Sequence, residues 1–127
     1  MKPIVVCTPN APAAIGPYSQ AVKVAGLLFS AGQIGLDPET MELVADDVRG
    51  QAMGALDNLE AILAAGGSDL SRVVKTTIFL VDMSDFAIVN EVYAHRFGET
   101  RPARSTVAVR ALPKGALVEI EAVAQVG

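Results

Sequence analysis

Aromatic residues, cysteine and histidine are scarce in this sequence: aromatics make up 5% of 127 residues, with one cysteine and one histidine. With Cys7 alone, neither an intrachain disulfide nor a cysteine metal cluster can form, which is typical of a reducing compartment. We expect Cys7 to be a small buried residue on the first strand. His95 cannot form a histidine metal site by itself, so no metal site is predicted.

Long apolar runs and basic clusters are also missing. No segment approaches the ~18 apolar residues of a membrane span, and the N-terminus has too short an apolar run for a signal peptide. The net charge is −4, and the ten Lys and Arg residues are scattered along the chain. Nucleic-acid binding needs a stripe of basic residues facing the phosphates. We therefore predict a cytoplasmic protein with neither a membrane nor a nucleic-acid partner.

Hydrophobic residues are abundant, at 51% of the sequence. Because few of them are aromatic, the core must be built from Val, Ile, Leu and Ala. The length fits one core, and no repeat or linker divides the chain, so residues 1–127 are predicted to form a single domain. Some of the apolar excess is expected to cover a subunit interface.

Apolar periodicity predicts an α+β fold. Strands are expected at 4–7, 21–25, 27–32, 73–81, 104–110 and 117–126, and helices at 46–65 and 85–97. Asp46 and Ser84 are the expected helix caps, and Gly66-Gly67 and Gly98 the expected stops. This order favours a mixed sheet with two helices packed on one face. The other face is then expected to be covered by another copy of the chain.

The last two strands are predicted to form a hairpin, because Leu112-Pro113-Lys114-Gly115 is a turn-rich connector. Alternation in the final strand places a row of apolar residues in the core and directs Glu119 away from it. In the preceding strand, Ser105 and Val107 are assigned to the core, so Arg104 and Thr106 are expected on the opposite face. Arg104 and Glu119 would then share the non-core face.

Several separated segments resemble the RidA (YjgF/YER057c/UK114) family, in the same order along nearly the whole chain. They are residues 11–20 (APAAIGPYSQ), 31–34 (AGQI), 74–77 (VKTT), 85–90 (DFAIVN), 102–105 (PARS) and 118–121 (VEIE). The resemblance implies chorismate-mutase-like subunits assembled as a homotrimer, with sites in the clefts between chains and no metal or organic cofactor. It also implies a 2-iminobutanoate/2-iminopropanoate deaminase, which hydrolyses reactive imines or enamines such as 2-aminoacrylate to 2-keto acids and ammonia.

Site residues follow from the same resemblance, position by position. Arg104 matches the arginine that binds the substrate carboxylate, and its planar guanidinium suits bidentate capture. Glu119 matches the acidic residue that positions or activates water, as a general base. Tyr18 and Asn90 match pocket residues, with Tyr18 among the catalytic group. Backbone groups near Gly32 and Ala103 are expected to complete the pocket.

The predicted hairpin separates Arg104 from Glu119 by about four rungs, or ~13 Å at ~3.3 Å per residue. One small substrate cannot span that distance. We therefore predict that each site takes Arg104 from one subunit and Glu119 from its neighbour.

Two pocket positions depart from the common family pattern. Ala31 replaces a serine, which removes a polar contact because Ser30 is expected on the other side of the strand. Thr106 replaces a cysteine and leaves a hydroxyl of similar size. The departure at Ala31 keeps open a non-catalytic keto-acid-binding regulatory protein. A ribonuclease or translation inhibitor is a further alternative, which the excess of acidic over basic residues disfavours.

Overall fold

The computed structural model describes all 127 residues, and its elements follow the predicted order. They are β1 (Ile4–Val6), β2 (Ala21–Val24), β3 (Leu27–Ser30), α1 (Val48–Ala65), β4 (Val73–Leu80), α2 (Phe86–Phe97), β5 (Ala103–Ala108) and β6 (Val118–Gln125). Three short 3-10 turns, at Leu70–Arg72, Met83–Asp85 and Pro113–Gly115, join some of them. Every strand and helix expected from the sequence is present, with ends shifted by one or two residues.

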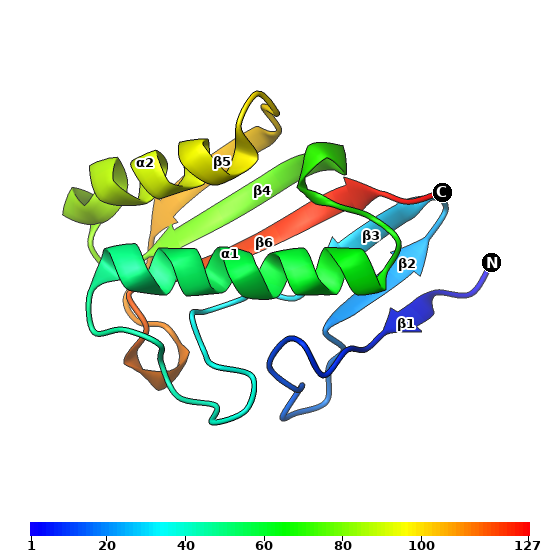
Figure 1. Cartoon of the computed structure of the whole chain (residues 1–127), viewed down its shortest axis with the longest axis horizontal. Coiled ribbons are helices and arrows are strands. Elements are labelled where there is room, and N and C mark those ends of the chain that lie inside the picture. The colour runs from blue at the N-terminus through cyan, green and yellow to red at the C-terminus, as the bar shows by residue number, and fades with distance from the viewer.

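The six strands form one mixed sheet in the order β1-β2-β3-β6-β4-β5. Only β4 and β5 are parallel, and all other neighbours are antiparallel. Both helices lie on the same face of the sheet, and the two chain ends lie at the same end of the molecule (Figure 1). The predicted α+β arrangement of two helices on one sheet face is confirmed.

The predicted hairpin between the last two strands is wrong. β5 pairs with β4 alone, while β6 lies between β3 and β4. The segment β4–α2–β5 is a strand–helix–strand crossover, which joins parallel neighbours. The connector after β5 therefore leads the chain across β4 instead of back along β5, and β5 forms an edge of the sheet (Figure 1).

Helix α1 packs its apolar stripe onto the sheet. Leu56, Leu59, Ile62 and Leu63 are fully buried, as their spacing of three and four residues requires. Asp47, not the expected Asp46, caps the helix by accepting a hydrogen bond from the backbone N–H of Gly50. The helix ends at Gly66-Gly67 as predicted.

Helix α2 begins differently from the expectation. Ser84 does not cap it: the Ser84 backbone N–H donates to the Asp82 carboxylate within the preceding 3-10 turn. The apolar side of α2 is buried, and the rings of Tyr93 and Phe97 stack at 4.3 Å between centroids. Gly98 ends the helix with a φ of 61°, a conformation that favours glycine.

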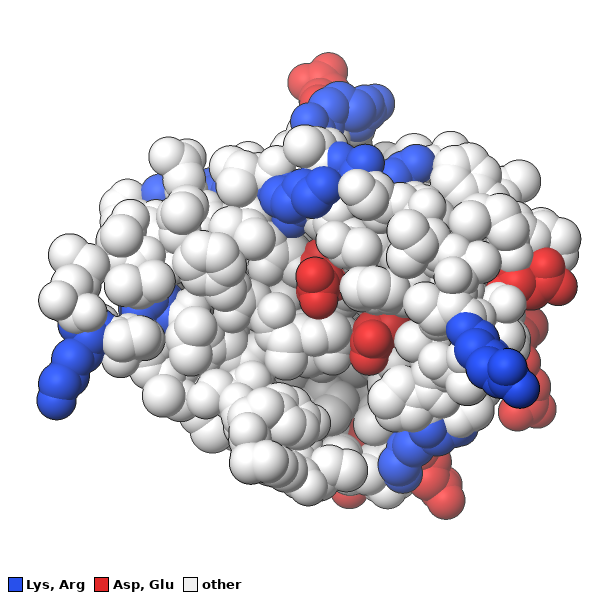
Figure 2. Space-filling view, turned by 180° about the vertical axis from the view of Figure 1, so that it is seen from behind, with Lys and Arg blue, Asp and Glu red and all other residues white.

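The two faces of the sheet differ in how they are covered. The predicted apolar row of β6 is buried beneath the helices, and it begins with Val118 and Ile120. The helix-free face leaves Phe29, Val74 and Val107 each at least 40% exposed. Figure 2 looks onto this face, where acidic side chains near the centre lie in a mostly uncharged surface. An apolar face of this kind is typical of a surface that another protein chain covers.

Two further findings concern features noted in the sequence. Cys7 follows β1 and is exposed, so the expectation of a buried Cys7 is wrong. Neither helix has the length and apolarity that crossing a membrane requires.

Candidate active site: two clefts on opposite faces of the sheet

Arg104 lies on the helix side of the sheet, which corrects the face assigned from the sequence. In the parallel β4–β5 pair it stands beside Thr76, whose side chain is fully buried under α2. Ser105 and Val107, expected in the core, point instead to the helix-free face, where Ser105 accepts a hydrogen bond from Lys75. The alternation in β5 was misleading because its helix-free side includes apolar residues such as Val107, and an apolar row of this kind resembles the side of a strand that faces the core.

The Arg104 guanidinium is held over aromatic rings of α2. Its central carbon lies 4.8 Å from the centroid of Tyr93 and 5.6 Å from that of Phe86. The Tyr93 hydroxyl is in turn fixed by a buried 2.7 Å hydrogen bond with Thr76. Arg104 makes no ion pair with any carboxylate. Its planar cation is therefore oriented by stacking while its N–H groups remain available to an anion.

A cleft opens between α2 and the start of β5 at this arginine. We call it the arginine cleft, and it is lined by Asn90, Tyr93, Ala94, Phe97, Arg101, Pro102 and Arg104. Asn90, predicted as a pocket residue, lies one turn before Ala94 on the same helix. No acidic side chain lines the cleft. Its composition suits a small ligand with a carboxylate and an apolar body.

Glu119 lines a second cleft, on the helix-free side of the sheet. Its neighbour across the strands is Phe79, whereas the residues on either side of it, Val118 and Ile120, face the core. The glutamate cleft is lined by Pro12, Ala13, Ile15, Tyr18, Gln20, Gly32, Gln33, Ile34, Leu36, Met41, Pro113, Lys114 and Glu119. Tyr18 lines this cleft and is 55% exposed.

Buried glutamines build the walls of the glutamate cleft. The Gln20 side chain bonds the backbone of Thr8, Ala11 and Pro12, which orders the loop leading to Tyr18. Gln33 exchanges both backbone hydrogen bonds with Ile120. This bridge places Gly32 directly against Glu119.

The Glu119 carboxyl is half-buried, and burial is the main cause that raises its pKa above the usual value for glutamate. The nearby negative charge of Glu121 raises the pKa further. Gly32 gives the carboxyl its space, because a Cβ at Gly32 would lie 2.7 Å from Glu119 Cδ. A carboxylate with a raised pKa can exchange protons closer to neutral pH than an ordinary glutamate.

Three other predicted pocket positions, Ala31, Ala103 and Thr106, are not among the residues that line the two clefts. Ala31 donates its backbone N–H to the Gln20 carbonyl, and Ala103 is the exposed first residue of β5. Thr106 lies on the helix side beside Ile78, and its hydroxyl is buried with no hydrogen-bond partner. Ser30 is engaged elsewhere, since its hydroxyl accepts from the Ala122 backbone.

Within one chain, the predicted residues fall into two separate groups. Tyr18, Gly32 and Glu119 meet in the glutamate cleft, whereas Asn90 and Arg104 meet in the arginine cleft. The prediction that Arg104 and Glu119 share a face is therefore wrong. No three His, Cys, Asp or Glu side chains are grouped so that they could hold a metal ion.

Sequence reasoning missed three residues of the arginine cleft or its support. Phe86 and Tyr93 lie on the apolar side of α2, and their rings also contact the Arg104 guanidinium. Their spacing of seven residues, two helical turns on one side of α2, was the available signal. Arg101 belongs to no segment that resembles the family, yet it lies three residues before Arg104 and lines the same cleft.

The sheet with two helices on one face, together with a cleft that contains an unpaired arginine and a cleft that contains a partly buried carboxyl, defines a small α+β protein with two candidate ligand clefts. The chain belongs to the Endoribonuclease L-PSP family, whose model matches residues 8–126. The resemblance to the RidA family inferred from the sequence motifs is confirmed by this match and by the relatives.

Relatives resemble this chain over nearly its full length. It is 52% identical to the mouse protein 2-iminobutanoate/2-iminopropanoate deaminase, over 97% of this chain and 91% of the mouse protein. The structure of RidA from the Antarctic bacterium Psychrobacter is 47% identical, with a TM-score of 0.93 over 97% of this chain and 99% of that one. Escherichia coli TdcF with bound serine is 42% identical, with a TM-score of 0.92 over 98% of this chain and 99% of TdcF.

Proposed function

We propose that this protein is a 2-imino acid deaminase, which hydrolyses 2-iminobutanoate, 2-iminopropanoate and their enamine forms to 2-keto acids and ammonia. The observation that carries the proposal is the unpaired Arg104 guanidinium, stacked over Tyr93 and Phe86 and open to a small carboxylate. The mouse relative is named for this activity, and the TdcF structure has a small amino acid bound.

The reaction needs positioned water and a proton acceptor more than it needs strong bond activation. Arg104 would hold the substrate carboxylate with two charge-assisted hydrogen bonds. Glu119 would accept a proton from water as the water oxygen forms a bond to C2 and the C=N double bond becomes a single bond. Glu119 then returns that proton to the nitrogen, which gives a carbinolamine with a C2 hydroxyl and an amino group. The remaining hydroxyl proton is transferred to the amino group, again through Glu119, as the C–N bond breaks, so the C2 oxygen becomes a carbonyl and ammonia leaves.

The raised pKa of Glu119 suits this double role. A carboxyl that both takes and returns a proton works best when its pKa lies close to the working pH. Tyr18 in the glutamate cleft and Asn90 in the arginine cleft supply a hydroxyl and an amide that can orient the substrate. The backbone at Gly32 and Ala103, with Ala31 and Thr106 nearby, would complete the pocket.

We further propose that the site forms between subunits of a homotrimer. Arg104 and Asn90 of one subunit would face Tyr18, Gly32 and Glu119 of the next, which gives three sites for three chains. The separation of the two groups in one chain and the apolar helix-free face support this assembly. A cytoplasmic location is consistent with a single exposed thiol, Cys7, that has no disulfide partner.

The decisive experiment is a coupled assay with a threonine dehydratase, which releases the imine, while the appearance of 2-oxobutanoate is followed. The purified protein should speed that appearance, and Arg104→Ala should remove the effect. Arg49→Gln is the matched control, because it removes an exposed arginine of α1 that pairs with Glu91 outside both clefts. Equal acceleration by Arg104→Ala and the parent protein would disprove the assigned site.

The family is named for an endoribonuclease, which keeps ribonuclease activity as a second candidate. The net charge of −4 argues against it, because RNA binding depends on basic surface. Incubation of the protein with RNA in a chelating buffer tests it directly, and cleavage would support this candidate. A non-catalytic keto-acid binder would instead bind 2-oxobutanoate in calorimetry without accelerating imine hydrolysis.

A further inference from the structure

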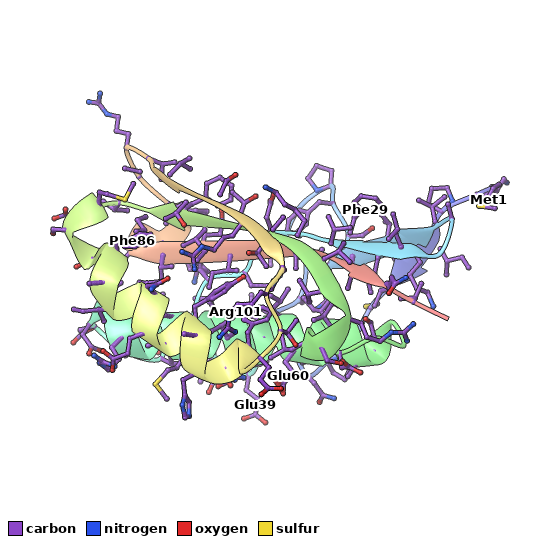
Figure 3. The ribbon with its side chains drawn as sticks, turned by 90° about the horizontal axis from the view of Figure 1, so that it is seen from above. Met1, Phe29, Glu39, Glu60, Phe86 and Arg101 are labelled. Carbon is purple, nitrogen blue, oxygen red and sulfur yellow. The ribbon has the colours of Figure 1, made fainter.

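The arginine cleft contains a second guanidinium, that of Arg101. Arg101 lies in the short segment between α2 and β5, and Figure 3 shows it on the helix side of the sheet, next to the C-terminal half of α2. Like Arg104, it makes no ion pair with a carboxylate. The two arginines line one cleft that has no acidic side chain, in a protein with a net charge of −4.

Backbone contacts hold Arg101 beside the cleft. Its Nη1 donates to the carbonyls of Gly98 and Thr100, at the C-terminal end of α2. That end of a helix carries partial negative charge, which stabilises a nearby cation. A guanidinium has donors on three nitrogens, and no hydrogen bond is made by Nε or Nη2 of Arg101. Capping of α2 therefore uses only part of this side chain.

The spacing of Arg101 and Arg104 fits two anionic groups on one small molecule. Strict alternation along a strand would direct residues three apart to opposite faces, but Arg101 and Pro102 precede β5 and are not part of it. The Cα atoms are separated by at most about 10 Å of chain. Both residues line the cleft, so their guanidinium groups are available to two carboxylates of one four- or five-carbon acid.

Both guanidinium groups are positively charged and neither is paired with a carboxylate, so their mutual repulsion makes the binding of an anion in the cleft more favourable. A substrate with one carboxylate neutralises one guanidinium and leaves the other unpaired. A substrate with two carboxylates neutralises both. Charge balance in the cleft therefore favours a dianionic ligand.

We propose that Arg101 is a specificity-determining residue that binds a second carboxylate, so the cleft prefers dicarboxylic 2-imino acids such as 2-iminoglutarate or 2-iminosuccinate. Arg104 binds the carboxylate next to the imine carbon, and Arg101 binds the one at the far end of the chain. This inference rests on the proposed function for the reaction, while the binding preference can be measured separately.

The test is calorimetric titration of the assembled, full-length protein with two keto acids of equal carbon number. 2-Oxoglutarate ends in a carboxylate, and 2-oxopentanoate ends in a methyl group. We expect 2-oxoglutarate to bind about 10-fold more tightly or better, as a charge-assisted hydrogen bond predicts. Arg101→Gln should remove most of that preference, whereas Arg49→Gln should keep it.

A turnover measurement complements the titration. Amino-acid oxidases acting on glutamate and on norvaline would supply the matching dicarboxylic and monocarboxylic imines, and trapping with semicarbazide would report their lifetimes. The ratio of the two deamination rates should fall in Arg101→Gln relative to the parent protein. Circular dichroism and thermal unfolding verify that the variant is folded, and Arg101→Lys, which keeps the charge, should retain part of the preference.

The outcomes separate this inference from the proposed function. Equal binding of the two keto acids by the parent protein, or an unchanged preference in folded Arg101→Gln, overturns the role of Arg101 even if imines are hydrolysed. Preferential binding of 2-oxoglutarate that depends on Arg101 supports that role even if no imine is hydrolysed, in which case the deaminase proposal alone fails.

Discussion

Arg104 and Glu119 point to opposite faces of one sheet. Arg104 stands beside Thr76 under α2, and Glu119 stands beside Phe79 on the helix-free side. A sheet lies between the two side chains, so one chain cannot place them on the same small substrate. The proposed reaction therefore requires contact between copies of the protein.

Mixing two inactive variants should restore activity. Arg104→Ala and Glu119→Gln chains, unfolded together at equal amounts and reassembled, would place an intact arginine against an intact glutamate in about a quarter of randomly formed sites. We expect the coupled dehydratase assay to recover about that fraction of parental activity per site, while each variant alone stays inactive. An absence of recovery in trimers shown to be mixed would contradict a shared site.

Arg104→Lys should not preserve function, although it keeps the positive charge. Lysine lacks the planar group that stacks over Tyr93 and Phe86 and that binds a carboxylate through two parallel hydrogen bonds. We expect KM to rise by about 10-fold or more, which corresponds to loss of about one charge-assisted hydrogen bond. Steady-state kinetics across substrate concentrations measures this. Unchanged KM in Arg104→Lys would argue against bidentate binding.

Glu119 should set the acidic limit of activity. Only its ionised form accepts a proton, so activity is lost as the pH falls through its pKa, which burial and Glu121 raise above the ordinary glutamate value. Glu119→Gln should lower kcat by about 10²–10⁴-fold, the usual contribution of a general base. A pH profile of the parent enzyme whose acidic limb lies at or below the ordinary glutamate pKa would contradict this assignment.

Glu119→Gln should raise the stability of the protein although it lowers activity. A carboxyl whose pKa is higher in the folded than in the unfolded state binds its proton more tightly when folded, so the ionised form lowers stability above that pKa. This loss is relieved as the pH falls through the folded pKa. Glu119→Gln should therefore raise the unfolding temperature at neutral pH, and the gain over the parent should shrink in acid.

Gly32→Ala should reduce activity without unfolding the protein. The added Cβ would lie 2.7 Å from Glu119 Cδ, and the flexible carboxyl can move away from it. Gly35→Ala is the contrasting variant, because its Cβ would lie 2.6 Å from the backbone oxygen of Gln51 on α1. Kinetics and thermal unfolding should show an activity loss for the first substitution and a stability loss for the second.

Tyr93→Phe should lower stability, because it leaves the buried Thr76 hydroxyl without a hydrogen-bond partner. The ring remains under Arg104, but the buried Thr76 hydroxyl loses its 2.7 Å partner. A buried polar group without a partner costs about 1–3 kcal/mol. The double variant Thr76→Val with Tyr93→Phe removes both polar groups and should be closer to the parent in denaturant unfolding. A double variant less stable than Tyr93→Phe would contradict this explanation.

The elements could be predicted from the sequence because each has a strong local pattern. The apolar stripe of α1, its stop at Gly66-Gly67 and the alternation of β6 specify their structures without knowledge of the rest of the chain. The helix caps were wrong because Asp47, directly after the expected Asp46, caps α1, and because Ser84 lies in a 3-10 turn where its N–H donates to Asp82.

Strand pairing could not be derived from the same local patterns. The connector at Leu112–Gly115 favours a hairpin, whereas the helix between β4 and β5 favours a parallel pair, and the structure follows the helix. The face of Arg104 was wrong for a separate reason, because Val107 is apolar but contributes to the helix-free surface instead of the core. The resemblance to family motifs identified the site residues, but a motif does not show which face of the sheet each residue occupies.

The placement of the two clefts on either side of a single sheet has a practical consequence for any assay at low protein concentration. In the proposed trimer each site needs two chains in contact, so a chain separated from its neighbours by dilution would have both clefts but no complete site. Specific activity should then fall with dilution, and measured rates will report the strength of subunit association as much as the chemistry.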